Sequence, residues 1–288
     1  MSGRMKPGGT AAPTRVGVSS ASVGRDGTEV KAIPLSGTLI ASMRPGLLSV
    51  VIPAFNEEAR IGRTIAEVAA EIDRLAVDAE LIVVDDGSTD RTASLVDQIA
   101  NGDARVKLVR AAHAGKGAAV RRGMIEARGA WRFLADADLS MPISELTQFL
   151  DVADREGGDV LIGSREAHGA VRAGEPWSRH AIGRVFNWMV KLLVLRGIDD
   201  TQCGFKLFSG RAAQTLFPLQ RLDGFGFDVE ILFLARRAGF AIREIPVTWV
   251  YGRESKVNLS SGARGFLDLV AIRWNQLQRR YPSREDIR

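Results

Sequence analysis

The sequence predicts an α/β fold, a single domain with a mostly parallel central sheet. From Leu47 onward, short runs rich in β-branched residues alternate with segments whose apolar residues recur every three or four positions. This alternation is typical of repeated βα units. Acidic and glycine-rich residues follow directly after several predicted strands, at the sheet edge where open α/β sheets bind their ligands. Hydrophobic residues make up 45% of the chain, enough for one large core.

The first half of this domain has a regular order. Strands are predicted at residues 47–52, 80–84, 106–109, 131–135 and 159–163. A helix is predicted from its apolar spacing at residues 61–75, and further helices are predicted after Thr89 through about Ala100, at residues 116–127 and at residues 144–156. Ser88 and Thr89 stand where helix caps belong.

The second half is less regular. Helices are predicted at residues 178–196, 210–217, 227–239 and 266–281, and residues 199–208 read as a polar segment. Residues 241–250 are predicted as a strand, and Pro246 within it indicates an edge position because proline cannot donate to a neighbouring strand.

Three segments are expected along the chain. Residues 1–46, rich in Gly, Ser, Thr, Ala and Pro, are predicted to be a disordered basic tail. Residues 47–256 form the α/β domain, and residues 257–288 form a C-terminal amphipathic helical segment. The tail carries +4 of the formal net charge of +5, so the folded body is nearly neutral. A neutral body argues against a nucleic acid partner.

Neither a membrane span nor a disulfide is expected. The longest apolar stretch after the tail, residues 185–195, is interrupted by Asn187 and Lys191 and is shorter than the roughly 20 residues that cross a bilayer. The tail lacks the apolar segment of a signal peptide. The single cysteine, Cys203, cannot form an intrachain disulfide, which favours a reducing compartment such as the cytoplasm.

Two carboxylates, Asp136 and Asp138, follow the predicted strand at residues 131–135. Side chains two apart on a strand point the same way, so a cation would relieve the repulsion between them. Hard oxygen ligands suit Mg²⁺ or Mn²⁺, and Mg²⁺ is often held by one or two carboxylates together with substrate phosphates. The pair predicts a metal site for a nucleotide diphosphate, with a solvated acidic turn as the alternative.

Asp85 and Asp86 end the second predicted strand, before a Gly-Ser-Thr-Asp turn. A carboxylate there could accept a hydrogen bond from a base or a ribose hydroxyl, although turn and cap chemistry would explain the same residues. Lys116 begins a predicted helix and could contact a phosphate, or be a surface lysine. The surrounding residues are not a P-loop, because Arg110 and Gly117 stand where that motif needs Gly and Ser or Thr.

Five segments resemble, in order and spacing, the family 2 GT-A glycosyltransferases: Ser49–Glu58, Val83–Ser88, Gly115–Gly117, Asp136–Asp138 and Gly163–Arg165. Two later segments, Asp200–Phe208 and Phe227–Glu230, resemble the dolichyl-phosphate β-glucosyltransferase branch, of which the dolichyl-phosphate mannosyltransferases are close relatives. The resemblance covers about Leu47 to Lys256. It implies a GT-A-like, Rossmann-type single domain.

The resemblance also implies an activity, an inverting, metal-dependent transfer of glucose from UDP-glucose to a polyprenyl phosphate. Asp136 and Asp138 would bind Mg²⁺ or Mn²⁺. Phe55 stands where relatives often have Tyr, so stacking would replace a phenolic hydrogen bond. Carried over by position, the residues expected to bind the nucleotide sugar are Pro53, Phe55, Glu57, Asp86, Lys116, Asp136, Ala137, Gln202 and Asp228.

The acceptor phosphate is expected to meet four basic residues, Arg165, Arg179, Arg184 and Lys256. Arginine forks suit bidentate contacts to phosphate, although each could be a solvated charge. Arg165 and Arg184 join Asp136 and Asp138 as the predicted catalytic residues. Because a lipid phosphate is already anionic at neutral pH, its oxygen can attack the anomeric carbon without a dedicated general base.

Several neighbouring polar residues have structural interpretations. Asp228 and Glu230 could cap or pair at the start of their helix instead of binding sugar hydroxyls, and Cys203 is expected to pack. The three histidines share no metal-ligand spacing and are expected to be surface or structural residues: His113, His168 and His180.

A lipid acceptor requires contact with a bilayer surface. The segments at residues 179–196 and 266–281 combine Trp and Leu with Arg and Lys, and either could lie in the membrane interface or be an ordinary core helix. The expected location is cytoplasmic and peripheral at the cytoplasmic membrane face. The oligomeric state stays open.

Other functions fit parts of the same pattern. A family 2 transferase could use GDP-mannose or a soluble acceptor instead. A nucleotidyltransferase would have a glycine-rich loop with Arg and Lys after the first strand, where this chain has residues 53–57, Pro-Ala-Phe-Asn-Glu. A non-catalytic protein would bind UDP without turnover.

Overall fold

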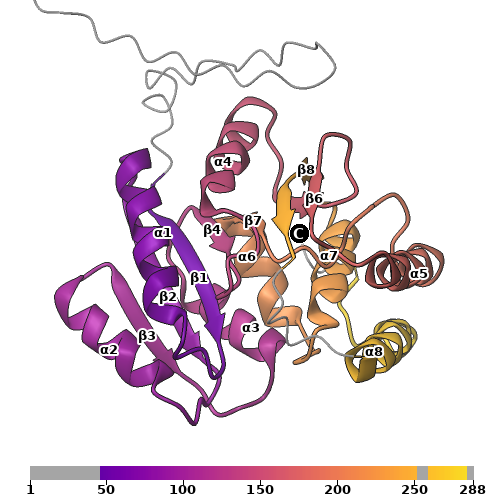
Figure 1. The fold of residues 1–288 in the computed structure, drawn as a ribbon. Coiled ribbons are helices and arrows are strands. Elements are labelled where there is room, and N and C mark those ends of the chain that lie inside the picture. Colours follow the sequence, from indigo (N-terminus) through magenta and orange to yellow (C-terminus); the bar gives the residue numbers. More distant parts are fainter. Residues whose placement is uncertain (1–45, 252–258, 284–288) are drawn as a thin grey trace, which may run out of the picture. The chain divides into compact units, whose positions relative to one another are not determined.

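The computed structural model describes residues 46–251 and 259–283, and the side chains of residues 178, 179, 182 and 259–264 fall outside this description. The described residues belong to one compact unit, Ile40–Arg288. A seven-stranded sheet forms its centre, in the order β3-β2-β1-β4-β7-β5-β8 (Figure 1). Its strands are β1 Leu48–Ala54, β2 Ala79–Asp85, β3 Val106–Arg110, β4 Trp131–Leu134, β5 Val160–Ser164, β7 Lys206–Ser209 and β8 Ile242–Pro246.

The sheet is parallel except at β7, which runs antiparallel to both of its neighbours, β4 and β5. Strand β1 is apolar apart from the buried Ser49, because both faces of the sheet are covered. Val50 and Ile52 pack into the core on one face, and Val51 packs into the core on the other. The predicted α/β fold with a mostly parallel sheet is confirmed.

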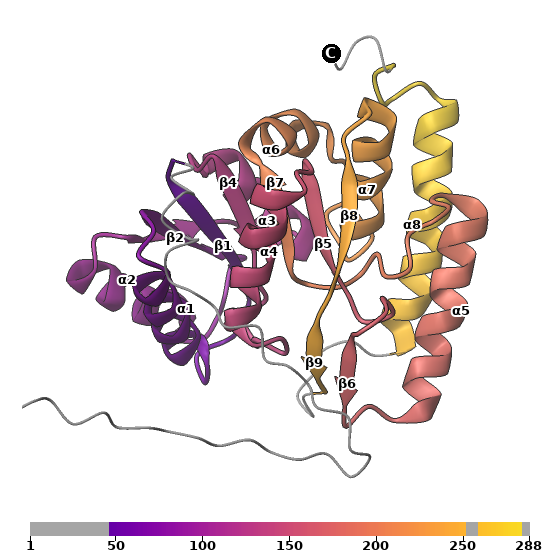
Figure 2. The same cartoon turned by 90° about the horizontal axis from the view of Figure 1, so that it is seen from above.

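Helices cover both faces of the sheet (Figures 1 and 2). Residues of α1, α2 and α4 share one core, and residues of α3, α6 and α7 share the other, to which α5 and α8 add Val190, Leu269 and Ile272. The helices are α1 Ile61–Leu75, α2 Thr92–Gly102, α3 Lys116–Glu126, α4 Leu146–Arg155, α5 Trp177–Leu193, α6 Gly210–Leu216, α7 Phe227–Ala238 and α8 Leu259–Leu277, with short 3₁₀ turns at Ile143–Glu145 and Phe217–Leu219.

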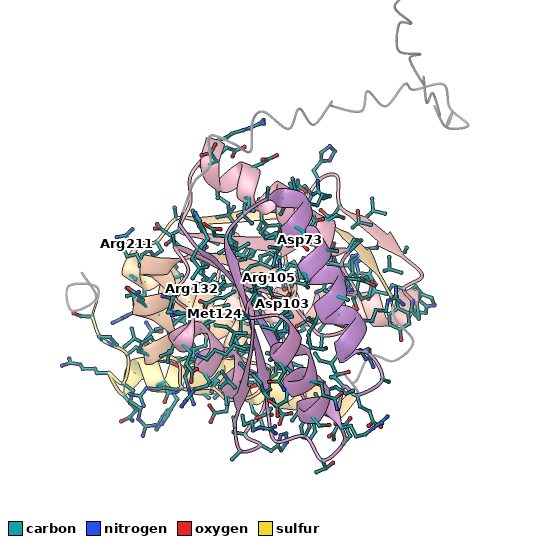
Figure 3. All side chains as sticks on the ribbon, turned by 90° about the vertical axis from the view of Figure 1, so that its left-hand side faces the viewer. Asp73, Asp103, Arg105, Met124, Arg132 and Arg211 are labelled. Carbon is teal, nitrogen blue, oxygen red and sulfur yellow. The ribbon has the colours of Figure 1, made fainter. Side chains whose placement is uncertain are left out.

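Charged side chains also hold the layers together. Arg105, just before β3, contacts Asp73 of α1 at 2.6 Å and Asp103 at 2.7 Å. Arg132 of β4 is buried and donates to the backbone carbonyl of Met124 in α3 (Figure 3). These contacts join β3 to α1 and β4 to α3.

The predicted elements of the first half agree with the structure to within a few residues. The caps predicted at Ser88 and Thr89 are the exception, because α2 begins at Thr92 and neither residue caps it. Instead, the Ser88 hydroxyl accepts from the Asn56 backbone N–H at 2.9 Å, and the Thr89 N–H donates to the Asn56 side chain at 2.8 Å. These residues tie together the loops that follow β1 and β2.

The second half differs in two places. The polar segment predicted at residues 199–208 contains β7, an inserted strand whose Lys206 is buried. The single strand predicted at residues 241–250 is divided after Pro246 into β8, which is an edge strand as expected, and β9 Thr248–Val250. Strand β9 pairs with β6 Val171–Ala173 in a separate two-stranded sheet that sequence analysis did not predict.

The predicted tail, residues 1–46, lies outside the described residues except for Gly46. The C-terminal helical segment is seen as α8, which begins earlier than the expected residue 266. Within the described ranges, no helix has both the length and the apolarity needed to cross a bilayer.

Candidate functional site

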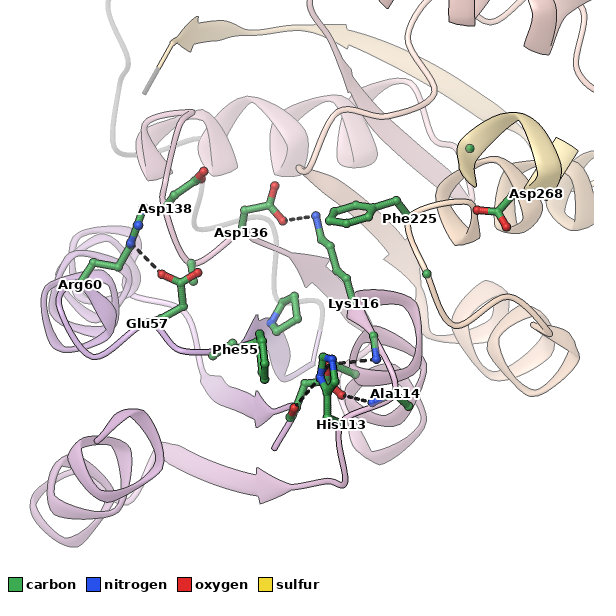
Figure 4. Close-up of a pocket in the computed structure, with 18 of the residues that line it drawn as sticks. Phe55, Glu57, Arg60, His113, Ala114, Lys116, Asp136, Asp138, Phe225 and Asp268 are labelled. Carbon is green, nitrogen blue, oxygen red and sulfur yellow. Dashed lines mark hydrogen bonds and ion pairs between the residues drawn. The ribbon is translucent and has the colours of Figure 1, made fainter. Parts of the chain in front are cut away.

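A pocket of about 670 Å³ opens at the carboxyl ends of β1, β2 and β4 (Figure 4). β2 lies on one side of β1 and β4 on the other, which makes this edge a topological switch point, the usual ligand site of an open α/β sheet. Eight residues predicted for the nucleotide sugar and the metal line it: Pro53, Phe55, Glu57, Asp86, Lys116, Asp136, Ala137 and Asp138. Pro53 lies near the end of β1, Phe55 and Glu57 follow it, and the last three follow β4.

Lys116 and Asp136 form an ion pair in the pocket lining (Figure 4). The Lys116 ammonium lies 2.7 Å from the Asp136 carboxylate. Burial disfavours both charges, but the attraction of each group to the opposite charges around it outweighs this cost, so the pKa of Lys116 is raised and the pKa of Asp136 is lowered. Lys116 is the first residue of α3, directly after Gly115, whose φ of 121° only glycine adopts readily. This turn aims the ammonium into the pocket.

Asp86 organises a second wall. Its buried carboxylate accepts from the backbone N–H groups of Ala114 at 2.9 Å and Gly115 at 3.0 Å, and lies 2.8 Å from Nδ1 of His113. The His113 ring stacks on Phe55, with centroids 4.2 Å apart and planes at 19°. Asp86 therefore holds the loop before α3 and thereby places an aromatic pair at the pocket wall.

Two further ion pairs lie near Asp136. Lys206 of β7 contacts Asp228 of α7 at 2.5 Å, and both side chains are almost completely buried. The Arg165 guanidinium donates two hydrogen bonds to the Asp200 carboxylate, of 2.6 and 2.9 Å. Burial disfavours the Asp200 carboxylate, but the charge of Arg165 and its hydrogen bonds bring the pKa of Asp200 below its ordinary value. The charges of Lys206 and Arg165 also help to lower the pKa of Asp136.

Not every predicted site residue reaches the pocket. Its lining includes neither Gln202 nor Asp228, and neither Arg165 nor Arg184. Asp228 pairs with Lys206, which is the structural alternative weighed for it, and Cys203 packs against Met141 as expected. Arg184 is exposed on α5, 3.5 Å from Glu166.

The remaining acceptor residues cannot be placed in the same way. Arg179 lies on α5, but its side chain is outside the described residues, as is the whole of Lys256. The clustering of the four basic residues at one phosphate therefore stays a prediction.

Sequence analysis missed several lining residues. His113, expected at the surface or in a structural role, is exposed and also lines the pocket. Arg60 pairs with Glu57 at 2.7 Å beside Asp138 (Figure 4). Phe225 and Asp268 approach from the second half of the chain, where no motif marked them. Of these residues, only His113 could have been indicated by the sequence, because it stands three residues before Lys116, a predicted phosphate contact.

Gly204 fits against Asp136 so closely that a side chain there would displace the carboxylate. A Cβ at this position would lie 2.0 Å from Oδ2 of Asp136. Gly204→Ala should therefore leave the fold intact, push Asp136 away from Lys116 and lower turnover roughly 100-fold. Kinetics and thermal unfolding of this variant check the prediction, with Gly62→Ala as control because nothing lies within 4 Å of its added Cβ. Unchanged turnover in Gly204→Ala would contradict it.

The family model for glycosyl transferase family 2 matches residues 49–217. A dolichyl-phosphate beta-glucosyltransferase of Trichomonas vaginalis is 36% identical over 236 residues, covering 77% of this chain and 69% of the relative. The dolichyl-phosphate beta-glucosyltransferase of Saccharomyces cerevisiae is 34% identical over 246 residues, covering 78% of this chain and 74% of the relative.

Solved structures resemble the chain over a similar extent. Glucosyl-3-phosphoglycerate synthase from Mycobacterium tuberculosis, in complex with Mn²⁺, UDP and glucosyl-3-phosphoglycerate, superposes with a TM-score of 0.64 at 21% identity, covering 84% of this chain and 85% of that one. This likeness shows the fold, and the predicted GT-A-like architecture is confirmed. The matched family model and the relatives establish that the chain belongs to glycosyl transferase family 2 and is a hexosyltransferase similar to the dolichyl-phosphate beta-glucosyltransferases.

Proposed function

We propose that this chain transfers glucose from UDP-glucose to a dolichyl-type polyprenyl phosphate, with inversion at the anomeric carbon and with a divalent metal ion. The observation that carries the proposal is the pocket itself, which combines an aromatic wall, a half-buried lysine and a carboxylate pair at the carboxyl ends of the strands. The activity named for the relatives, at 31–36% identity, supports the choice of donor sugar and acceptor.

The aromatic wall suits the nucleoside of the donor. A uracil ring would stack in line with Phe55 and His113, whose rings are already parallel. Pro53 and Glu57 line the same wall. The carboxylate of Asp86 accepts three contacts from residues 113–115, so we assign it chiefly to positioning this loop, with its remaining acceptor capacity available to the nucleoside.

The residues present fit the metal ion that the family implies. Asp138 is exposed on the pocket wall, and its carboxylate accepts from the Ser140 backbone N–H at 3.0 Å. No group of three His, Cys, Asp or Glu that could hold an ion occurs in the described part of the chain. We propose that Asp136 and Asp138 hold Mg²⁺ or Mn²⁺ together with diphosphate oxygens. The ion would supply positive charge to stabilise the leaving UDP.

The reaction then needs positioning more than proton transfer. An oxygen of the lipid phosphate forms a bond to the anomeric carbon as the bond from that carbon to UDP breaks, and the electron pair leaves on UDP. Lys116 stands beside Asp136 and would bind the diphosphate. We propose Arg165, Arg179, Arg184 and Lys256 as the acceptor-phosphate residues, and the cytoplasmic membrane face as the place of action.

Of these basic residues, Arg184 offers the cleaner test because its side chain is 68% exposed and its contact with Glu166 is long, at 3.5 Å. Arg184→Ala should lower kcat/KM for the acceptor about 10- to 100-fold, with the KM for UDP-glucose unchanged. Arg211→Ala, an equally exposed arginine on α6, is the control. Initial rates measured with each substrate varied in turn test this prediction. If kcat/KM falls equally for both substrates, Arg184 does not belong to the acceptor site.

The whole proposal is tested by supplying labelled UDP-glucose and GDP-mannose in parallel to a short-chain polyprenyl phosphate, with Mg²⁺, with Mn²⁺ and with chelator. Chelator-sensitive product from UDP-glucose is expected. Product from GDP-mannose alone would replace the glucosyl assignment with a mannosyl one. Nucleotide binding without lipid product from either donor would refute the proposed acceptor.

A further inference from the structure

Exposed apolar side chains are concentrated on two neighbouring helices. Thirteen large hydrophobic residues are exposed in the described part of the chain, and nine of them belong to α5 and α8. On α5 they are Trp177, Val185, Trp188 and Leu192; on α8 they are Phe266, Leu267, Val270, Trp274 and Leu277. So unequal a distribution marks an interaction surface, because single exposed apolar residues are normally scattered.

The nine residues form one stripe on each helix. At 100° per residue, the four positions on α5 fall within an arc of about 80°, and the five on α8 within about 100°. On α8 the opposite side carries Leu269 and Ile272, which are buried in the domain core. Each helix therefore packs with one side and leaves a coherent apolar side outward.

The helices also lie side by side. Arg273 of α8 donates to the carbonyl of Leu193 in α5, and a Cβ on Gly265 of α8 would lie 2.9 Å from the ring of Phe186 in α5. Figure 2 shows both at the same margin of the domain, with no other helix or strand outside them. The two stripes are thus parts of a single region, which we call the α5–α8 face.

The charge of these helices indicates the kind of partner. By sequence, α5 and α8 contain five Lys or Arg and a single acidic residue, Asp268. The side chain of Asp268 accepts from the Gly226 backbone N–H at 3.1 Å. Tryptophan and leucine flanked by basic residues fit the boundary between the headgroups and acyl chains of an anionic bilayer.

The face is continuous with the pocket. Leu267 belongs to the α8 stripe and also lines the pocket, together with Gly265 and Asp268 of the same helix. We propose that the α5–α8 face docks on an anionic lipid bilayer and that the pocket meets the bilayer along α8 at Leu267. The proposed docking is inferred from the exposed residues of α5 and α8 alone. The proposed entry of an acceptor lipid beside Leu267 rests in addition on the proposed function.

The test compares two double variants of the full chain that add the same charge. Trp188→Glu/Trp274→Glu alters the α5–α8 face outside the pocket lining; these side chains are 63% and 56% exposed. Ile125→Glu/Val171→Glu is the control, because those residues are 49% and 53% exposed on other elements. Each chain is sedimented with vesicles of phosphatidylcholine, with and without phosphatidylglycerol.

We expect the unaltered chain and the control to bind the anionic vesicles, and the Trp variant to bind at least about tenfold more weakly. Equal binding by both variants overturns the proposal. An unaltered chain that ignores vesicles but elutes as a dimer, which the Trp variant dissociates, also overturns it in favour of a second copy of the chain.

Transfer assays separate this inference from the proposed function. The Trp variant should keep its turnover of a soluble short-chain polyprenyl phosphate and lose turnover of a long-chain acceptor embedded in vesicles. If no polyprenyl phosphate accepts glucose, the proposed function fails and the sedimentation result still decides the docking. If the soluble acceptor reacts but the chain does not sediment, only the docking fails.

Discussion

Asp138→Asn is expected to lower turnover of UDP-glucose at least about 100-fold while leaving thermal unfolding nearly unchanged. The variant keeps the shape of the side chain and its acceptor for the Ser140 N–H, which lies 3.0 Å away, and removes only the negative charge. Because Asp138 is exposed, the fold does not depend on that charge. The loss should fall on metal-dependent turnover.

The measurement is the initial rate across a series of Mn²⁺ concentrations, with Asp97→Asn as the control. Asp97 is also exposed, and its partner is the surface residue Arg110. If no metal acts here, removal of a negative charge beside the diphosphate would strengthen UDP binding and spare turnover. Tighter UDP binding with normal turnover in Asp138→Asn would contradict the assignment of Asp138. So would normal turnover of this variant that chelator still abolishes.

Lys206→Met is expected to destabilise the fold by about 3–5 kcal/mol, because Asp228 would be left buried without its cation. The Lys206 side chain is 1% exposed and lies 2.5 Å from Asp228. Burial raises the pKa of Asp228 even with Lys206 in place, so the isolated carboxylate would be costlier still. For a domain of this size the melting temperature should fall by roughly 10 °C.

A double-mutant cycle separates the pair from other effects. Lys206→Met/Asp228→Asn should be more stable than the sum of the single variants predicts, because neither buried charge remains. Both groups also act on the site, since Asp228 raises the pKa of Lys116 and Lys206 lowers that of Asp136. Turnover should therefore stay reduced in the double variant although stability recovers. Single variants within about 1 kcal/mol of the original chain would contradict the prediction.

The outer part of the pocket could be predicted because its residues follow strands that the sequence marks clearly. Strands β1, β2 and β4 are short apolar runs, and their carboxyl ends must meet at one sheet edge. Eight predicted residues do line one pocket for this reason. The motif resemblance supplied the order of these segments, and the family is confirmed.

The ion pairs near Asp136, outside the pocket lining, could not be predicted, because their signals are contacts between distant residues. Lys206 and Asp228 are 22 positions apart, and Arg165 and Asp200 are 35 apart. A lysine in a polar segment predicts a loop until its buried partner is known, which is why β7 was missed. The place of His113 in the pocket lining was missed for the same reason, since its neighbours Phe55 and Asp86 come from two other loops.

The sequence by itself determined the α/β class, the positions of most helices and strands, and the edge of the sheet where the carboxylates gather. These features follow from local periodicity and from strand ends, which a few consecutive residues define. Tertiary structure decided which charges pair, which of the predicted residues face the pocket, and that α8 closes one wall of it while leaving an apolar side outward. Those outcomes depend on burial, because only packing of distant segments removes water and makes one partner necessary to another.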